Sequence, residues 1–175
     1  MRPASGAAVV AVGVATLAIA VAMAAVQSAP NASPIYGVTL PPRYREWQVV
    51  SVAHEAGSLN DIRVTLGNKM AMRAYRAGTR PFPDGTMIAR LAWKYVPSAR
   101  NNAIFGQPQS FVAGDPTNVQ IETKDSRRFA ATGGWGYGQY EQGAANQSAA
   151  LLATCFACHD RLAKTEDLVF THYSP

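Results

Sequence analysis

Residues 86–95 read Thr86-Met87-Ile88-Ala89-Arg90-Leu91-Ala92-Trp93-Lys94-Tyr95, the longest candidate strand of the chain. Successive side chains of a strand point to opposite faces of the sheet. One face of this stretch is apolar throughout, with Met87, Ala89, Leu91, Trp93 and Tyr95. The other face carries two cations, Arg90 and Lys94, beside Ile88 and Ala92. The apolar face predicts the core side, and the cations become informative if their face lines a cavity.

Further strands and short helices are expected on both sides of this stretch. Alternating or aromatic patterns predict strands at the end of 44–52 and at 62–66, 119–123 and 133–140. A helix is predicted at 69–77, after the N-cap Asn68 and before Gly78. Residues 96–118 contain three prolines and two glycines, and predict a long loop holding Phe105 and Phe111. The pattern favours an α+β domain, mainly an antiparallel β-sheet with a few short helices.

A C-x-x-C-H motif lies near the C-terminus, at Cys155-Phe156-Ala157-Cys158-His159. This spacing is typical of covalent c-type haem attachment. Two thiols three positions apart suit thioether bonds to one porphyrin edge, and His159 is then placed to bind the iron. Both cysteines of the chain belong to the motif. The sequence therefore predicts one covalent haem c, held by Cys155 and Cys158, with His159 as the metal ligand.

Two other interpretations of the motif lack support. A thioredoxin-like redox pair needs a strand before it, whereas residues 147–154 have a helical pattern. A zinc site needs two more ligands at finger-like spacing. The other histidines, His54 and His172, are not spaced that way and are interpreted as ordinary surface or hydrogen-bonded residues.

The N-terminus predicts export. Residues 6–26 are apolar or small, and Ala22-Met23-Ala24 resembles a signal-peptidase site. We interpret residues 1–24 as a signal peptide, with an uncleaved anchor over residues 6–26 as the alternative. Residues 25–41 are then a flexible tether, and residues 42–175 form the haem domain. Covalent haem attachment to an exported chain predicts a periplasmic location.

The charge balance limits the classes of partner. The chain has 16 Lys and Arg against 11 Asp and Glu, a net charge of +5. The positive charges are scattered, so nucleic-acid binding is not indicated. A redox partner protein is expected, but the charge does not identify it.

Several blocks, in order along the chain, resemble the cytochrome P-460 family. They are Tyr44-Arg45-Glu46-Trp47, Asp84-Gly85-Thr86, Lys124 to Ala130, Gly134-Trp135, the haem motif, Ala163-Lys164-Thr165 and Val169-Phe170-Thr171. The resemblance implies a mainly antiparallel β fold, a homodimer and one haem c per subunit. It also implies His159 as the proximal ligand and an open distal iron position. Members of the family include enzymes that oxidise hydroxylamine to nitrous oxide and relatives, the cytochromes c′-beta, that bind nitric oxide.

Two residues depart from the hydroxylamine-oxidising members. Those enzymes cross-link a lysine to the porphyrin, and its position falls on Arg90 here, whose guanidinium stays protonated. Lys94 is an alternative cross-linking residue if the strand shifts its register. The pocket carboxylate of those enzymes falls near Gln120, and Glu122 on the same strand face is the alternative. Arg90 is also a candidate donor to a ligand on the iron.

Other candidates have more ordinary interpretations. A sixth iron ligand among Met70, Met72 and Met87 is possible, although core packing is the commoner use of methionine. Phe105 and Phe111 either cap the distal face of the haem or pack within their loop. Three aromatic residues of the glycine-rich stretch are expected in the core or at a dimer contact rather than as redox relays: Trp135, Tyr137 and Tyr140.

The residues together favour an exported monohaem c-type cytochrome that binds small nitrogen ligands, nitric oxide or hydroxylamine, at an open iron site. A redox or electron-transfer role accompanies the binding. The alternative function is a hydroxylamine oxidase forming nitrous oxide, and a second alternative is a simple electron-transfer cytochrome c with a methionine ligand.

Overall fold

The computed structural model describes residues 31–174. The predicted signal peptide (residues 1–24), the whole of the alternative anchor (residues 6–26) and residues 25–30 of the tether lie outside this part of the chain. Within the described residues, no helix is both long and apolar enough to cross a membrane.

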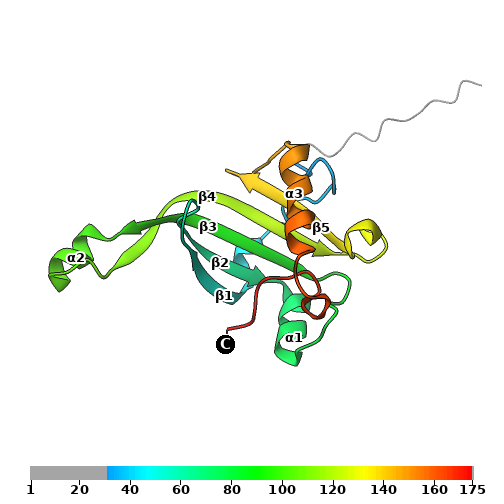
Figure 1. Cartoon of the computed structure of the whole chain (residues 1–175), viewed down its shortest axis with the longest axis horizontal. Helices are drawn as coiled ribbons and strands as arrows, with labels where there is room; N and C mark the ends of the chain where they lie inside the picture. The colour runs from blue at the N-terminus through cyan, green and yellow to red at the C-terminus, as the bar shows by residue number, and fades with distance from the viewer. Residues whose placement is uncertain (1–30, 175) are drawn as a thin grey trace, which may run out of the picture.

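An antiparallel sheet of six strands forms the centre of the described domain (Figure 1). Its strands are β1 (Gln48–Glu55), β2 (Asp61–Gly67), β3 (Met87–Pro97), β4 (Phe111–Lys124), β5 (Trp135–Glu141) and β6 (Ala144–Ala145). The strand order in space is the order along the chain, so each strand pairs with the one that follows it. This arrangement confirms the predicted fold class.

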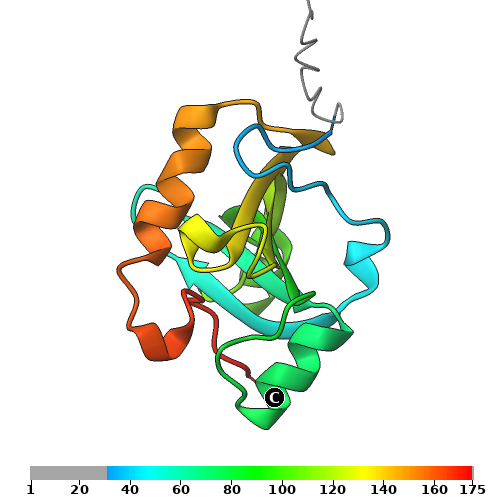
Figure 2. The ribbon, with the colours of Figure 1, turned by 90° about the vertical axis from the view of Figure 1, so that its right-hand side faces the viewer.

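Three α-helices accompany the sheet: α1 (Lys69–Ala77), α2 (Ala99–Phe105) and α3 (Ala149–His159). Three 3₁₀ turns, η1 (Tyr44–Glu46), η2 (Ala130–Thr132) and η3 (Lys164–Glu166), lie in the connections. Helix α1 has the predicted bounds because the Asn68 side chain accepts a hydrogen bond from the Ala71 amide, and Gly78 ends the helix at φ 63°. Figure 2 shows the sheet between α3 on one side and residues 40–47 on the other.

The first half of β3 is buried on both faces. Ala89 and Leu91 are buried on the predicted core side, and Ile88 and Ala92 are buried on the opposite side. The predicted core side is therefore confirmed, and the opposite side is covered as well, since Ile88 lines a cavity together with residues of α3 and of the C-terminal segment. The pairing with β4 then shifts its register between Ala92 and Trp93, and again before Tyr95.

The long loop predicted at 96–118 is also wrong. Strand β3 continues to Pro97, α2 follows, and β4 begins at Phe111. The Ser98 hydroxyl caps α2 by accepting from the Asn101 amide, and Gly106 ends it at φ 70°. Residues 93–117 thus form a projecting arm, which we call the outer hairpin (Figure 1).

The described part of the predicted tether, residues 31–41, is packed rather than flexible. Tyr36 and Val38 are buried in the core. The Tyr140 hydroxyl donates to the Val38 carbonyl at 2.7 Å, and the Ser33 hydroxyl donates to the Tyr137 carbonyl at 2.8 Å. These hydrogen bonds to backbone carbonyls fix the position of the segment, so the ordered domain begins before residue 42.

Candidate functional site

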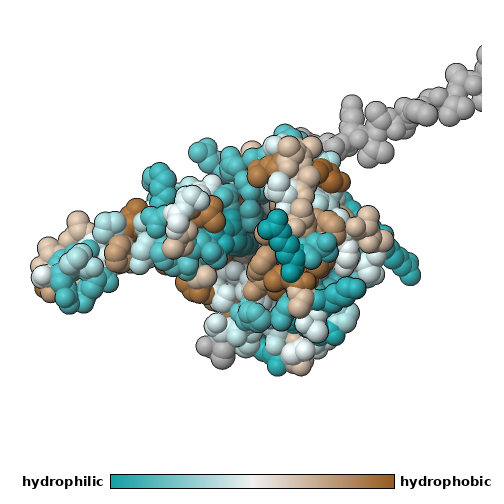
Figure 3. All heavy atoms as spheres, in the orientation of Figure 1, coloured by the Kyte–Doolittle hydropathy of each residue, from teal (hydrophilic) through white to brown (hydrophobic). Residues whose placement is uncertain are grey.

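One face of the sheet lines a cavity of about 600 Å³ beneath α3 and the C-terminal segment. Most of its strand residues occupy alternate positions of β1 to β4, as the period of a strand requires. They include Ser51, Ala53, Glu55, Arg63, Thr65, Ile88, Arg90, Gln120 and Glu122. Cys158, His159 and residues 170–172 supply another wall. Figure 3 shows mainly hydrophilic residues around a hollow between α3 and the base of the outer hairpin.

A smaller cavity of about 200 Å³ shares four lining residues with the larger one: Gln120, Glu122, Cys158 and His159. Cys155, Thr154 and Tyr137 are among its remaining lining residues. Cys155, Cys158 and His159 of the haem motif therefore line these two neighbouring cavities.

Helix α3 positions these three residues. The Ser148 hydroxyl caps its first turn by accepting from the Leu151 amide, and the fully buried Leu152 anchors the helix to the core. Cys155 and Cys158 are three positions apart on the helix, so they lie on neighbouring turns of one side. Both are free thiols, and His159 is the last helical residue.

The His159 ring has a defined orientation. Its Nδ1 lies 2.6 Å from the Leu168 carbonyl oxygen. A carbonyl only accepts, so Nδ1 carries the hydrogen and Nε2 keeps a free lone pair suited to a metal. Nε2 lies 3.9 Å from Glu122 Oε1. The rings of Tyr137 and Phe170 each lie 4.9 Å from the imidazole, between centroids.

Glu122 faces the imidazole from β4. Its Oε2 is buried and has no hydrogen-bond partner among the described residues. Burial raises the pKa of the Glu122 carboxyl, while His159 and Arg90 oppose that change. Glu122 is thus a buried acid available to a group within the cavity.

Arg90 lies in the same cavity, on β3. One of its amino groups donates to Asn118 Oδ1 at 2.6 Å, and the other lies 3.7 Å from Asp61. Arg63 binds Asp61 with two hydrogen bonds of 2.9 Å. Burial lowers the pKa of Arg90, as does Arg63, whereas Asp61 and Glu122 raise it. The buried Nε of Arg90 has no partner among the described residues, so a donor remains for a ligand.

Lys94 lies elsewhere. Its side chain is 64 % exposed and is 3.6 Å from Asp115 of the outer hairpin, and it does not line either of these two cavities. The pairing of β3 with β2 is regular through Lys94, which lies opposite Asp61, the first residue of β2, so Lys94 lies beyond the cavity along the strand rather than turned away from it. Only the first of the two cations therefore reaches the cavity.

The other sequence candidates separate into cavity and core residues. Gln120 lines the cavity and donates to Gln139 at 2.9 Å. Trp135 and Tyr140 are core residues, as expected, and Tyr137 is a buried residue that also lines the smaller cavity. The three methionines Met70, Met72 and Met87 line neither cavity, and Met72 is buried in the core.

Phe105 and Phe111 belong to the outer hairpin rather than to the cavity. Phe105 is exposed, and Phe111 stacks on Tyr95 with ring centroids 4.5 Å apart. Tyr95 in turn stacks on His54 at 3.9 Å. His54 is thus a surface residue, whereas His172 lines the cavity, which its sequence neighbours did not indicate.

Sequence reasoning also missed the ionic group around Arg90. Asp61 and Arg63 occupy alternate positions of β2, and the pairing of Thr65 with Arg90 places them on the cavity face. The alternate spacing of Asp61 and Arg63 would have indicated this ionic group from the sequence if β2 had been paired with β3. No sequence pattern marked the Leu168 carbonyl, because any residue supplies one.

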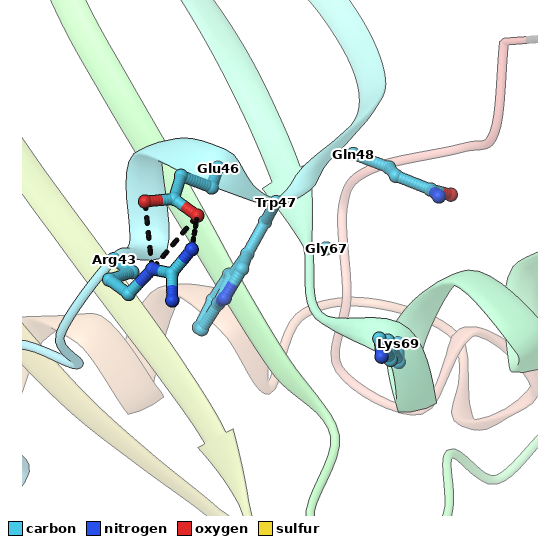
Figure 4. Close-up of a pocket in the computed structure, with 6 residues that line it drawn as sticks. All are labelled: Arg43, Glu46, Trp47, Gln48, Gly67 and Lys69. Carbon is cyan, nitrogen blue, oxygen red and sulfur yellow. Dashed lines mark hydrogen bonds and ion pairs between the residues drawn. The ribbon is translucent and has the colours of Figure 1, made fainter.

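A separate cavity of about 370 Å³ is lined by Arg43, Glu46, Trp47, Gln48, Gly67 and Lys69 (Figure 4). Its two main charges satisfy each other, since Arg43 Nε donates to both carboxylate oxygens of Glu46 at 2.8 and 2.9 Å. None of the haem-motif residues lines it, so the chemistry of the motif is placed in the cavities beneath α3.

Comparison with known families places the chain. A model of the family described as Cytochrome P460 matches residues 41–171. The chain belongs to this family. No curated protein gives a significant match. Membership of the cytochrome P460 family implies a haem cofactor, in agreement with the prediction from Cys155, Cys158 and His159.

The cavity residues fit the haem that the cytochrome P460 family implies. Two free thiols and an imidazole from a single helix line two cavities that share four residues. Apolar surface for a macrocycle is present, since Phe170 is 49 % exposed where it lines the cavity. The unpartnered Glu122 Oε2 and Arg90 Nε supply polar atoms on the facing strands. The donor set is that of a c-type haem rather than of a metal held by protein ligands alone.

Proposed function

We propose that this protein is an exported monohaem c-type cytochrome that binds nitric oxide or hydroxylamine at an open iron position and serves in redox or electron transfer. The observation that carries the proposal is the placement of functional groups on two facing sides of the cavities. Cys155, Cys158 and the lone pair of His159 Nε2 lie on one wall, and the unpartnered polar atoms of Arg90 and Glu122 lie on the facing strands.

Each residue has a distinct role. Cys155 and Cys158 attach the porphyrin, and His159 binds the iron through Nε2 because Nδ1 is occupied by the Leu168 carbonyl. The iron supplies a coordination position and exchanges an electron. Arg90 presents a fixed positive donor, which favours anionic or polar ligands in a site shielded from water.

An open iron position is supported by the residues around the cavity. A thioether ligand would require a methionine on the facing strands, and Met70, Met72 and Met87 do not line the cavities. This arrangement disfavours the simple electron-transfer cytochrome with a methionine ligand. His172, which lines the cavity, is exposed and belongs to the C-terminal segment that also carries Phe170.

Intact mass and absorption spectra of the secreted protein test the attachment. We expect a mass increase of one haem that survives acid–acetone extraction, and a sharp reduced haem c spectrum with no macrocycle cross-link. The C155S/C158S variant should lose the covalent haem, and the His159→Gly variant should keep it but require added imidazole for normal ligation. Recovery of wild-type protein with the bare polypeptide mass would refute the proposal.

Nitric oxide titration of the reduced protein tests the open position. We expect one equivalent to bind, with a change in the absorption spectrum. A sixth ligand supplied by His172 would slow this binding, so His172→Ala is the matched control. An unchanged rate in the control, together with stoichiometric binding in both proteins, is the expected result.

Hydroxylamine oxidation to nitrous oxide is the second candidate, and Glu122 favours it. A buried carboxylate with an unpartnered oxygen is placed to accept protons from a ligand in the cavity. Arg90, rather than a lysine, lies in the cavity, which weighs against the oxidase. Nitrous oxide yield from hydroxylamine with an artificial electron acceptor decides between catalyst and binder, and Glu122→Gln should abolish any yield that depends on this carboxylate.

Export and assembly are further parts of the proposal. Cleavage after residue 24 and a periplasmic location are tested by N-terminal sequencing and cell fractionation.

The homodimer implied by the family has a candidate contact on the outer hairpin, where Ile104, Phe105, Phe111 and Val112 are exposed. Sedimentation should give a dimer for the wild type and a monomer for I104E/F105E, whereas a wild-type monomer would remove this part.

A further inference from the structure

A buried ion pair lies next to the loop that holds His159. Lys124 Nζ, at the end of β4, donates to Asp167 Oδ1 at 2.7 Å, and the two side chains are only 7 % and 10 % exposed. The second carboxylate oxygen of Asp167 accepts from the Phe82 amide at 2.7 Å. Lys124 also donates to the Gly133 carbonyl at 3.1 Å. A buried ion pair is a poor source of stability, so its presence calls for another role.

The backbone beside this pair is strained. Asp167 and Leu168 are consecutive non-glycine residues with φ of 49° and 61°. Left-handed conformations of such residues persist only where their surroundings hold them. Here two segments distant in sequence hold Asp167 directly, Lys124 at the end of β4 and Phe82 before β3, and the Gly133 carbonyl in turn holds Lys124.

Two glycines make room for this arrangement. A Cβ atom on Gly133 would lie 2.6 Å from Leu168 Cδ1, and one on Gly134 would lie 3.2 Å from Lys124 Cε. Contacts that close require Leu168 or Lys124 to move. The turn at 133–134 is therefore shaped around the two residues that fix the loop.

The strained backbone ends at the carbonyl that binds the imidazole. Leu168 presents its carbonyl oxygen to His159 Nδ1 at 2.6 Å, immediately after Asp167. A hydrogen bond to the outer nitrogen of a metal-bound imidazole fixes the ring and raises its basicity toward the metal. The position of Asp167 thus controls how strongly this bond forms.

We infer that Lys124 and Asp167 are positioning residues for the proximal ligand: their ion pair holds the Leu168 carbonyl against His159 Nδ1 and so sets the electron donation of the imidazole to the haem iron. This inference rests on the proposed function, in which His159 binds the iron. It adds a control of the iron–histidine bond by two residues that do not touch the ligand cavity.

The test compares holoprotein variants by resonance Raman spectroscopy and redox titration. Asp167→Asn leaves one acceptor oxygen for two donors, and Lys124→Met removes one donor. The double variant K124M/D167N leaves no buried charge unpaired. In each we expect the iron–histidine stretching band of the reduced protein to move to lower frequency and the reduction potential to rise, with covalent haem unchanged.

A matched control separates positioning from general destabilisation. Tyr140→Phe removes the hydrogen bond from a buried hydroxyl to the Val38 carbonyl, far in sequence from residues 159–168. It should lower stability and leave the iron–histidine band in place. A band that stays at its wild-type frequency in K124M/D167N, or that moves equally in Tyr140→Phe, overturns the inference.

Two further measurements keep the inference testable if the ion-pair variants do not fold. Gly133→Ala should displace Leu168 and move the band in the same direction. In the wild type alone, the deuterium shift of the band should develop slowly in heavy water, because the carbonyl holds the Nδ1 hydrogen, and rapid development contradicts the inference. A wild type without covalent haem would instead refute the proposed function itself. This result differs from a wild type that has covalent haem but shows an unchanged iron–histidine band in the variants, which refutes the inference alone.

Discussion

The two halves of the β3–β4 hairpin differ although they share the same two strands. In the inner half, Met87 to Ala92 pair in regular register with Asn118 to Thr123, and both faces of β3 are buried. In the outer hairpin the register shifts twice, α2 is inserted, and large apolar side chains are exposed. The same strand is a cavity wall at one end and a projecting arm at the other.

The difference shows how position along a strand selects the functional residue. Arg90 and Lys94 are four positions apart and have the same parity, so their side chains leave the same face of β3. The pairing of β3 with β2 is regular through Lys94, which lies opposite Asp61 at the end of β2. Arg90 therefore lies over the cavity at 16 % exposure, whereas Lys94 lies beyond the cavity at 64 % exposure. Distance along the strand thus decides which cation can meet a ligand.

The largest expected contrast between the halves is in stability. Ile121→Ala removes a fully buried side chain of the inner half and should cost about 2–5 kcal/mol of unfolding free energy. Val112→Ala trims a side chain of the outer hairpin that is 40 % exposed, and should change stability by no more than about 0.5 kcal/mol. Urea unfolding of both variants measures the contrast, and equal costs would contradict it.

Ligand affinity provides the next contrast. Arg90→Gln removes a buried cation from the cavity and should weaken azide binding to the oxidised protein about tenfold, or ~1.4 kcal/mol. Lys94→Gln removes the same charge four residues away and should leave the azide affinity unchanged. Spectroscopic titration with azide is the measurement, and an equal or larger loss of affinity in Lys94→Gln would show that Lys94 also reaches the ligand.

A smaller, pH-dependent effect on stability is expected at Ser126 and Asp84, just beyond the end of the inner half. The Ser126 hydroxyl and amide donate to Asp84 at 2.7 and 2.8 Å, and these bonds lower the pKa of the Asp84 carboxyl. A lowered pKa adds stability above the unfolded-state value, and that stability is lost as the pH falls through the folded-state value. Ser126→Ala should therefore unfold at a higher pH during acid titration, and an unchanged acid midpoint would remove this contribution.

The smallest effect is expected for the ion pair of the outer hairpin. Lys94 and Asp115 are 64 % and 83 % exposed, so water and salt screen their attraction. Lys94→Ala should change the unfolding free energy by less than about 0.5 kcal/mol. Thermal unfolding at low and high salt measures it, and a cost of several kcal/mol would mean that the outer hairpin is as tightly held as the inner half.

Local signals predicted a large part of the fold. The Asn68 cap, the left-handed Gly78 and the alternating strands act within a few residues, so the sequence alone was sufficient for α1 and for β2, β3 and β5. The haem motif was equally local, and its place on a helix followed from residues 147–154. To predict that Glu122 and Arg90 share one cavity, only the period of a strand and the pairing of the adjacent strands β3 and β4 were required.

The remainder depends on pairing between distant segments. The exposure of Lys94 depends on where β2 ends opposite it, at Asp61, and on the extent of the cavity, and no pattern within 86–95 shows either. The packing of Tyr36 and Val38 follows from contacts with β5, more than 90 residues away. The role of Asp167 likewise depends on Lys124 and Phe82, which approach it only in the folded chain.

The strand order has a consequence for how the protein folds. Because β1 to β6 pair in chain order, each strand of the sheet pairs with its immediate successor. The sheet can therefore form one hairpin at a time, and pairing between strands that are close in sequence favours rapid folding. The helix that bears Cys155 and Cys158 follows the last strand, and the C-terminal segment that completes the cavity follows that helix.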